Sequence, residues 1–152
     1  MKFKIKKFKD LSVTELYDLL RLRSEIFVLE QKCIYVDQDG NDANSLHVLG
    51  YIKNKLIAYA RIVSPGTIFK TVSIGRVVVD EKFRGKEYGY LLMEKSIKET
   101  QKKHKPEVIS ISAQTHLQKF YNRLGFKAVG KTYLDCDIPH ITMLLKKTSA
   151  KK

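Results

Sequence analysis

A basic segment with two glycines joins an apolar run to a helical pattern near the middle of the chain. The three valines at residues 77–79 are typical of a buried β-strand, and the sequence YLLM at residues 90–93 begins a helical pattern. Gly85 and Gly89 leave the backbone between them open to close approach by a ligand. The first amides of a helix lack intrahelical partners and carry a partial positive charge, so this unit predicts a cradle for a diphosphate.

The segment matches neither of the two commonest nucleotide-binding fingerprints. The sequence contains no G-x-x-x-x-G-K-[ST] P-loop, and the G-x-G-x-x-G spacing of dinucleotide-binding proteins is missing. Glycines at a strand-to-helix turn also commonly serve only to relieve backbone strain. The segment alone therefore leaves open whether it binds a ligand.

The length and composition of the chain indicate one globular domain. With 152 residues, of which 43% are apolar and 30% charged, the chain is long enough to build a hydrophobic core. No apolar run approaches the roughly 20 residues that a membrane span needs. The basic N-terminus alternates with Phe3, Ile5 and Phe8, which favours a strand over a signal peptide. We therefore expect a cytoplasmic protein with no membrane partner.

The two cysteines and the histidines show no metal-ligand spacing. Cys33 and Cys136 are far apart in the sequence, and two reduced thiols are favoured over a disulfide in a cytosolic protein. No two histidines lie at helical i, i+4 spacing. We expect no metal site.

The formal net charge of +13 is large for a chain of this length. Such a charge suits nucleic acid, an anionic surface or a phosphate-rich cofactor as a partner. The lysines, however, are spread along the whole chain, and no helix-turn-helix or RNA-binding signature accompanies them. We interpret most of the charge as solvated surface and rank a nucleic-acid-binding function well behind an enzymatic one.

Hydrophobic periodicity predicts the elements of a mixed α/β sheet in the order β-α-β-β-β-α-β-α-β-β. The first helix begins at a capping box, Ser12 to Glu15, and its two apolar stripes indicate a break near Arg23 and Ser24. The polar and acidic residues 35–45 are expected to form a flexible loop. Strands are predicted at residues 2–9, 46–52, 56–63, 72–79, 108–113, 126–129 and 138–145, and helices at residues 12–31, 89–104 and 115–124.

Two motifs that follow one another in this order resemble those of the GNAT acetyltransferases. Residues 84–89 are similar to the R/Q-x-x-G-x-G/A element of that family, with Glu87 where the family usually has glycine. The sequence FYNRLGF at residues 120–126 resembles the FY-x-x-x-GF ending of the same family. Further matches, to the ElaA-like branch, occur at residues 27–31, 59–62, 74–77, 113–118 and 138–141, so the resemblance covers nearly the whole chain.

The resemblance implies a fold and a domain layout. The fold class would be α/β (α+β, GNAT-like), with a mixed, mostly antiparallel central sheet of about seven strands and helices on both faces. A single N-acetyltransferase domain is expected at residues 1–147, followed by a basic tail at residues 148–152. The chain would act as a monomer or a homodimer.

The resemblance also implies an N-acetyltransferase in which a primary amine attacks the thioester of acetyl-CoA directly. The acceptor would be a small amine, a polyamine, or an amine of a peptide or protein. The valine strand would pair through its backbone with the pantetheine arm, and the glycine-bearing loop would bind the diphosphate. The cofactor-binding residues implied in this way are Val77, Val78, Val79, Arg84, Gly85, Lys86, Glu87, Tyr88, Gly89, Tyr90, Gln114 and Tyr121.

Acyl transfer needs an acid for the departing thiolate and a base for the amine. The resemblance places Tyr121 beside the cofactor sulfur, and a phenol with a pKa of about 10 suits protonation of a thiolate. Tyr121 also lies at helical spacing with neighbouring leucines, so a role in core packing alone stays open. For the base we consider a water chain or one of the side chains of Glu30, His47, His116 and His140.

Acidic residues gather in two segments of this basic chain, at residues 37–42 and 135–137. The resemblance places both segments on the acceptor side, where carboxylates would attract a cationic amine. A simpler interpretation is that these acids only keep two loops solvated.

The alternative to an enzyme is a non-catalytic acyl-CoA-binding sensor, which would keep the cradle but would not need Tyr121.

Overall fold

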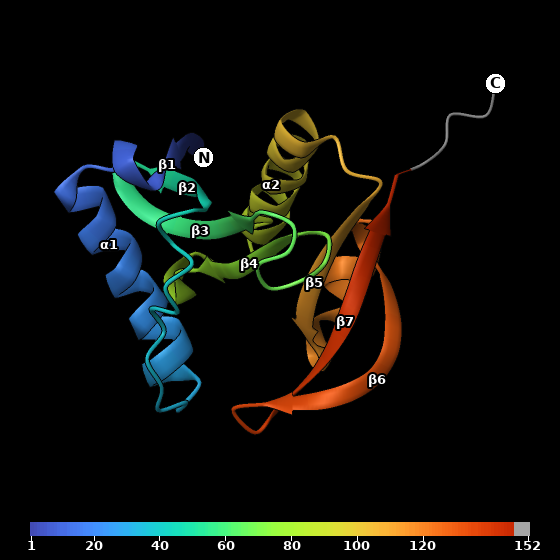
Figure 1. Cartoon of the computed structure of the whole chain (residues 1–152). Coiled ribbons are helices and arrows are strands. Elements are labelled where there is room, and N and C mark those ends of the chain that lie inside the picture. Colours follow the sequence, from blue (N-terminus) through green and yellow to red (C-terminus); the bar gives the residue numbers. More distant parts are fainter. Residues whose placement is uncertain (148–152) are drawn as a thin grey trace.

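The computed structural model describes residues 1–147 and contains a seven-stranded sheet with the strand order β1-β2-β3-β4-β5-β7-β6. All neighbouring strands are antiparallel except β4 and β5, which are parallel. The predicted mixed, mostly antiparallel sheet with helices on both faces is confirmed (Figure 1). The basic tail predicted at residues 148–152 lies outside the described residues.

The elements follow the predicted order. The strands are β1 (Lys2–Lys7), β2 (Leu46–Ile52), β3 (Lys55–Val63), β4 (Val72–Val79), β5 (Val108–Gln114), β6 (Lys127–Asp135) and β7 (Ile138–Lys146). The longer helices are α1 (Val13–Arg23), α2 (Tyr88–His104) and α3 (Gln118–Arg123). Short helical turns are η1 (Phe8–Asp10), η3 (Glu81–Phe83) and η4 (Thr115–Leu117), and the π-helix η2 spans Ser24–Glu30. No helix within residues 1–147 is long and apolar enough to span a membrane.

The first helix changes its hydrogen-bond pattern at the predicted break. α1 begins at a capping box in which the Ser12 hydroxyl accepts from the amide of Glu15, and the Glu15 carboxylate accepts from the amide of Ser12. α1 ends at Arg23, and the wider turns of η2 continue the segment to Glu30. A change in helical pitch rotates the following side chains, which accounts for the two apolar stripes in the sequence.

Two apolar clusters pack on opposite faces of the sheet. α1 and η2 cover one cluster, in which Leu19 and Leu49 are fully buried. α2 covers the other cluster, in which Met93 and Phe126 are fully buried. Figure 1 shows α1 and α2 on opposite sides of β2, β3 and β4. This double coverage leaves the edges and the strand ends as the places where a ligand can enter.

The sheet opens between β4 and β5, because these two strands pair only at one end. Val72 pairs with Ile109 and Ser73 with Ser110, and beyond these two pairs the strands diverge. β4 also bulges against β3 at this point, and Arg76 in the bulge adopts a φ of 52°. The opening divides the molecule into an N-terminal half, which we define as β1–β4 with α1, η2 and α2, and a C-terminal half, β5–β7 with α3.

The C-terminal hairpin is longer than the sequence predicts. β6 extends to Asp135, whereas only residues 126–129 were expected to be extended, because Gly130 and Lys131 interrupt the apolar alternation. A two-residue turn follows, in which Cys136 and Asp137 both have positive φ. The hairpin carries this turn back toward the N-terminal half.

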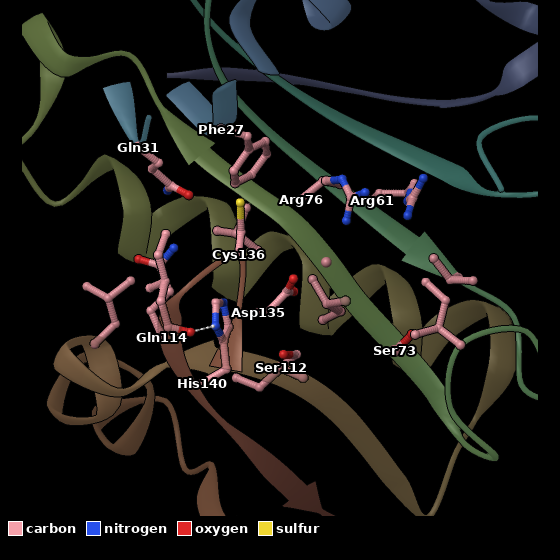
Figure 2. Close-up of a pocket in the computed structure, with 18 of the residues that line it drawn as sticks. Phe27, Gln31, Arg61, Ser73, Arg76, Ser112, Gln114, Asp135, Cys136 and His140 are labelled. Atoms are coloured by element: carbon pink, nitrogen blue, oxygen red, sulfur yellow. Dashed lines mark hydrogen bonds between the residues drawn. The ribbon is translucent and has the colours of Figure 1, made fainter. Parts of the chain in front are cut away.

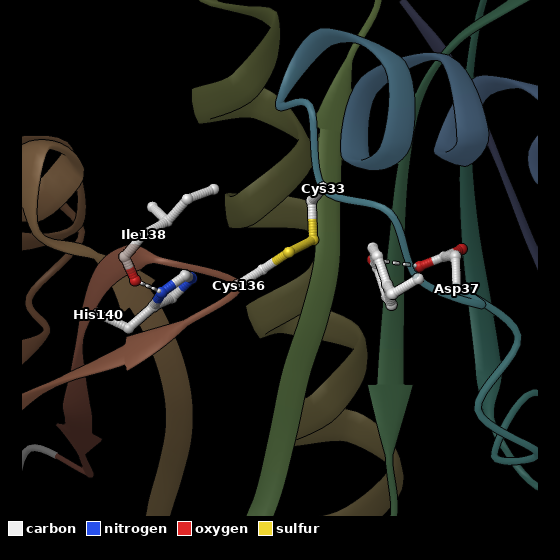
Figure 3. Close-up of a disulfide and its surroundings, with 6 residues drawn as sticks. Cys33, Asp37, Cys136, Ile138 and His140 are labelled. Carbon is white, nitrogen blue, oxygen red and sulfur yellow. Dashed lines mark hydrogen bonds between the residues drawn. A yellow bond between two sulfur atoms is a disulfide. The ribbon is translucent and has the colours of Figure 1, made fainter.

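Cys33 and Cys136 form a disulfide that joins the segment after η2 to the β6–β7 turn (Figure 3). The prediction of two reduced thiols is therefore wrong for this structure. The two Cα atoms lie 5.9 Å apart, within the range that the bond requires. This proximity depends on the long β6–β7 hairpin and spans 103 residues of sequence, so linear spacing did not reveal it.

Candidate active site

A cavity of about 520 Å³ lies at the opening between the two halves (Figure 2). Its walls come from β4, β5 and β7, from the segment after η2 and from the β6–β7 turn. The lining residues are Phe27, Gln31, Cys33, Tyr35, Arg61, Val63, Ile68, Phe69, Ser73, Ile74, Gly75, Arg76, Val77, Ile111, Ser112, Gln114, Leu117, Tyr121, Asp135, Cys136, Ile138 and His140. Of the residues predicted to form the site, the cavity brings together Val77, Gln114, Tyr121 and His140.

The predicted cradle lies where β4 leads through η3 into α2. Its backbone amides, at residues 85–90, have no hydrogen-bond partner within residues 1–147, and the amide of Leu91 is the first to be bonded, to the Glu87 carbonyl at 3.0 Å. Gly85 has a φ of 74°, and a Cβ built there would meet nothing within 4 Å. The free donors and the bare backbone are the features that bind phosphate at helix N-termini.

Glu87, the departure from the family motif, precedes α2 in the left-handed conformation, with a φ of 61° and a ψ of 4°. Glycine adopts this conformation without cost, which explains why glycine is usual at this position. The carboxylate makes no cap hydrogen bond to the helix and lies 3.5 Å from Nη2 of Arg123 at the exposed surface. Glu87 in place of glycine therefore adds backbone strain and negative charge, but its side chain does not block the amides of the loop.

Arg84 ties the loop to η2. Its Nε donates to the Val79 carbonyl at 3.1 Å, and its two Nη atoms donate to the two carboxylate oxygens of Glu30 at 2.9 and 3.0 Å. Glu30 does not line the cavity, and its carboxylate is already engaged, which argues against a role as the base. Lys86 is exposed at the loop and has no ion pair within residues 1–147.

Tyr121 of α3 both packs in the core and reaches the cavity wall. Its ring contacts Phe120 and Phe126 edge-on, with centroid distances of 5.0 and 6.0 Å. Burial raises the pKa of Tyr121 to about 12. The hydroxyl therefore keeps its proton at neutral pH, and the two roles considered for this residue are compatible.

His140 of β7 is the one base candidate among the cavity-lining residues. Its Nδ1 lies 2.8 Å from the carbonyl oxygen of Ile138, and its ring stacks on Tyr133 at a centroid distance of 6.0 Å. A carbonyl oxygen can only accept, so Nδ1 carries the proton and Nε2 carries the lone pair. The imidazole is thus held in the tautomer that can take a proton through Nε2.

The other two histidine candidates lie outside the cavity lining. His47 is fully buried, with Nδ1 at 2.7 Å from the Tyr59 hydroxyl and Nε2 at 3.0 Å from the Asp42 carbonyl. Burial lowers the pKa of His47, and both ring nitrogens are occupied, which argues against catalysis. His116 is exposed in η4.

The acidic segment at residues 37–42 is not the flexible, solvated loop that the sequence predicts. Its three aspartates form an ion network with three arginines from α1, β3 and β4. Arg23 and Arg61 are fully buried, and Asp37 is only 2% exposed. The closest contacts are Arg23 Nε to Asp37 at 2.6 Å, Arg23 Nη1 to Asp42 at 2.7 Å, Arg61 Nη2 to Asp39 at 2.6 Å and Arg76 Nε to Asp37 at 2.7 Å.

The network removes this segment as a source of excess negative charge. Burial alone would raise the pKa values of Asp39 and Asp42, but hydrogen bonds from Arg61 and Arg23 outweigh it and hold both pKa values below their ordinary range. Three carboxylates then balance three guanidinium groups. The expectation that these aspartates attract a cationic acceptor is therefore wrong, because their charge is already neutralised.

The second acidic segment does reach the site. Asp135, at the end of β6, lines the cavity and has no ion pair within residues 1–147, whereas Asp137 is not among the lining residues. Figure 2 shows the Asp135 carboxylate directed into the cavity. Of the two acidic segments that were expected to attract a cationic acceptor, only residues 135–137 place a carboxylate at the cavity.

The sequence interpretation missed the arginines of the site. Arg61 and Arg76 both line the cavity, and Arg76 is also the bulge residue with positive φ. Arg61 interrupts the otherwise apolar run LIAYARIV of β3, and a charge in a buried strand requires a buried partner. That pattern was the available signal for the ion network.

Comparisons with known proteins agree with the geometry. Residues 27–147 match the family model described as an acetyltransferase (GNAT) domain. The chain is 44% identical over 137 residues to the protein ElaA of Escherichia coli K12, which covers 88% of this chain and 89% of that protein. The crystal structure of Escherichia coli ElaA matches with a TM-score of 0.88 at 39% identity, covering 96% of this chain and 100% of that one.

Two further crystal structures share the fold. An acyl-CoA N-acyltransferase from Pseudomonas aeruginosa matches with a TM-score of 0.87 at 40% identity, covering 94% of this chain and 97% of that one. An aminoglycoside 6'-N-acetyltransferase complexed with coenzyme A has a TM-score of 0.74 at only 16% identity, covering 98% of this chain and 99% of that one.

Proposed function

The chain belongs to the GNAT acetyltransferase family and resembles its ElaA-like members, and on this premise we propose that it transfers the acetyl group of acetyl-CoA to a primary amine. Family membership identifies an acyl-CoA N-acyltransferase. The proposal adds the acetyl group, the amine and the residues that act on them.

The observation that carries the proposal is the continuity between the free amides at residues 85–90 and the cavity. β4 runs from Val77, which lines the cavity, to Val79 and then through η3 to those amides. An extended thioester arm along residues 77–79 would place a diphosphate at the amides and a sulfur at the cavity. The aminoglycoside enzyme crystallised with coenzyme A has the same fold, which supports coenzyme A as the ligand.

His140 and Tyr121 supply the proton transfers. In this proposal His140 takes a proton from the ammonium through Nε2, and the neutral amine then attacks the thioester carbonyl. As the carbon–sulfur bond breaks, the Tyr121 hydroxyl gives its proton to the departing thiolate, and the second proton that the nitrogen loses as the amide forms restores the Tyr121 hydroxyl. A pKa of about 12 keeps the hydroxyl protonated at neutral pH, so its proton is present when the thiolate forms.

Asp135 gives the acceptor its charge preference. Its carboxylate faces the cavity without an ion pair within residues 1–147, and the positive charges of the three arginines in the neighbouring network are balanced by their aspartates. A protonated amine that enters the cavity would therefore be drawn to Asp135, close in sequence to His140. The acceptor class is a cationic primary amine, such as a polyamine or a lysine-like amine.

Incubation of the full chain with acetyl-CoA and a panel of amines tests the proposal directly. The panel contains a diamine, a lysine peptide and, at matched concentration, an aromatic amine that is uncharged at the assay pH, and acetylated products are detected by mass spectrometry. We expect acetylated product in equal amount to the coenzyme A released. His140→Gln should lower kcat/KM by at least roughly 10²-fold, the scale of general-base loss, and His116→Gln, outside the cavity, should not.

The same experiment separates the enzyme from the sensor. Binding of acetyl-CoA in calorimetry, with no acetylated product from any amine on the panel, would favour a non-catalytic acyl-CoA sensor. Turnover that survives His140→Gln at the full rate would instead keep the activity and transfer the base role to a water chain.

A further inference from the structure

The Cys33–Cys136 disulfide connects the two halves of the molecule across the cavity. Cys33 follows η2 of the N-terminal half, and Cys136 forms the β6–β7 turn of the C-terminal half (Figure 3). The halves are also joined by the short parallel pairing of β4 with β5, at residues 72–73 and 109–110, by the contact between the Thr71 and Ser110 hydroxyls, and by an apolar cluster that both halves share. The disulfide therefore closes one side of a site whose sheet is already divided.

The hairpin that the disulfide fixes carries two groups of the proposed chemistry. Asp135 immediately precedes Cys136, and His140 follows it by four residues. Both line the cavity together with the two cysteines. The position of this turn therefore sets the position of the acceptor carboxylate and contributes to that of the base, which β7 also holds through its pairing with Gln114 and Tyr133.

We propose that Cys33 and Cys136 form a reducible clamp, a thiol–disulfide exchange site that holds the acceptor side of the cavity in its active arrangement. This inference rests on the proposed function, because it assigns a regulation to the same site. The ligand class is a dithiol. Oxidised protein holds the hairpin against the segment after η2, and reduced protein releases it.

The burial of the two residues gives the direction of the exchange. Cys136 is exposed at the turn, whereas Cys33 is only 5% exposed. A dithiol thiolate attacks Sγ of Cys136, the Cys33 thiolate leaves, and a mixed disulfide with Cys136 forms. The second thiol of the dithiol then attacks the first sulfur of the same dithiol, which is bonded to Cys136, and expels the Cys136 thiolate. The protein gains two electrons and two protons, and the dithiol becomes a cyclic disulfide.

The cofactor cradle lies apart from the clamp. The amides at residues 85–90 begin α2, which packs on β2, β3 and β4, whereas the disulfide fixes only the segment after η2 and the β6–β7 turn. Release of the clamp therefore alters acceptor use while acetyl-CoA binding remains.

Steady-state kinetics of oxidised and reduced protein tests the clamp. Dithiothreitol reduces the protein and is removed by gel filtration before the assay, because a free thiol would cleave the thioester. The mass must rise by the two hydrogens of reduction. We expect kcat/KM for the amine to fall by roughly 10- to 100-fold, the scale expected for a catalytic group misplaced by about 1 Å, with acetyl-CoA affinity unchanged. The Cys33→Ser/Cys136→Ser double variant should have the kcat/KM of the reduced protein, and treatment with dithiothreitol should not change it.

Hydrogen exchange provides a readout that does not depend on activity. In reduced protein and in the double variant, amides of residues 130–138 and of His140 should exchange faster, while amides of β2 and β3 keep their protection. Equal kcat/KM and equal exchange in protein of proven oxidised and reduced mass would overturn the clamp, as would two free thiols in air-oxidised protein. Faster exchange without any acetylation would support the clamp and would count only against the proposed function.

Discussion

The hydroxyl of Tyr121 is a single group whose removal isolates one chemical step. Tyr121→Phe keeps the ring between Phe120 and Phe126 but removes the proton that the departing thiolate would take. We expect kcat to fall by roughly 10²-fold, the lower range for loss of a general acid, with the Kd for acetyl-CoA little changed. Stopped-time product assays and calorimetry measure the two quantities.

Tyr51 offers a matched control for that substitution. Burial raises the pKa of Tyr51 to about 12, as it does for Tyr121, and its hydroxyl is buried without a partner within residues 1–147. Tyr51, however, packs on the face covered by α1 and does not line the cavity. Tyr51→Phe should keep the wild-type rate. A wild-type rate in Tyr121→Phe as well would limit Tyr121 to core packing.

Asp135 and Asp137 flank the β6–β7 turn, but only Asp135 lines the cavity. Asp135→Asn should raise the KM of a cationic amine by roughly 2- to 5-fold, the effect of about 0.5–1 kcal/mol from an exposed ion pair, and the effect should shrink as salt is added. Asp137→Asn should leave the KM unchanged, because Asp137 does not line the cavity. Asn tolerates the same left-handed backbone, so this variant keeps the turn. An equal response of both variants would show that general surface charge, not Asp135, governs the acceptor.

Among the elements, the segment at residues 35–45 owes its shape to the buried ion network. Asp42→Asn removes the negative charge that Arg23 and Arg61 share, at distances of 2.7 and 2.9 Å in the native chain. We expect the free energy of unfolding to fall by about 3–5 kcal/mol, the cost of breaking a buried ion pair. Urea denaturation measures it, and the surface variant Asp10→Asn should stay within about 0.5 kcal/mol of wild type.

The pH dependence of that difference follows from the pKa of Asp42. Burial would raise this pKa, but the hydrogen bonds from Arg23 and Arg61 lower it in the folded chain. The stabilisation is therefore fully present above the ordinary carboxyl pKa of about 3.9 and is lost as the pH falls through the lower, folded value. The gap between wild type and Asp42→Asn should be constant near neutral pH and narrow in acid. A gap that widens in acid would contradict the assignment of the network.

For the molecule as a whole, local signals predicted the fold and long-range contacts decided what was missed. The capping box at Ser12 and the strand at residues 72–79 depend on neighbours in the sequence, and both occur as predicted. The ion pair between Arg76 and Asp37 joins residues 39 positions apart, and the disulfide spans 103. No periodicity encodes such contacts, so the segment at residues 35–45 was expected to be flexible and the cysteines free.

In the candidate site, too, features set by neighbours in the sequence were predicted, and features set by long-range contacts were not. Free amides at the start of α2 follow from helix geometry, so the glycine-bearing loop was readable from the sequence. The choice among four bases was not readable, because it depends on which side chains the fold brings to one cavity. Only His140 of the four lines the cavity, and Asp135, which was expected for its charge alone, lines the same cavity.

An amide-resolved NMR titration of the isotopically labelled chain with coenzyme A tests the central claim most directly. If the diphosphate binds the free donors and the pantetheine arm runs along β4, the largest shift changes will occur at amides 85–90 and 77–79, and Gly89→Val will abolish them while the rest of the spectrum stays folded. Saturable binding that leaves those amides unshifted and perturbs another part of the chain would contradict the assignment of the site.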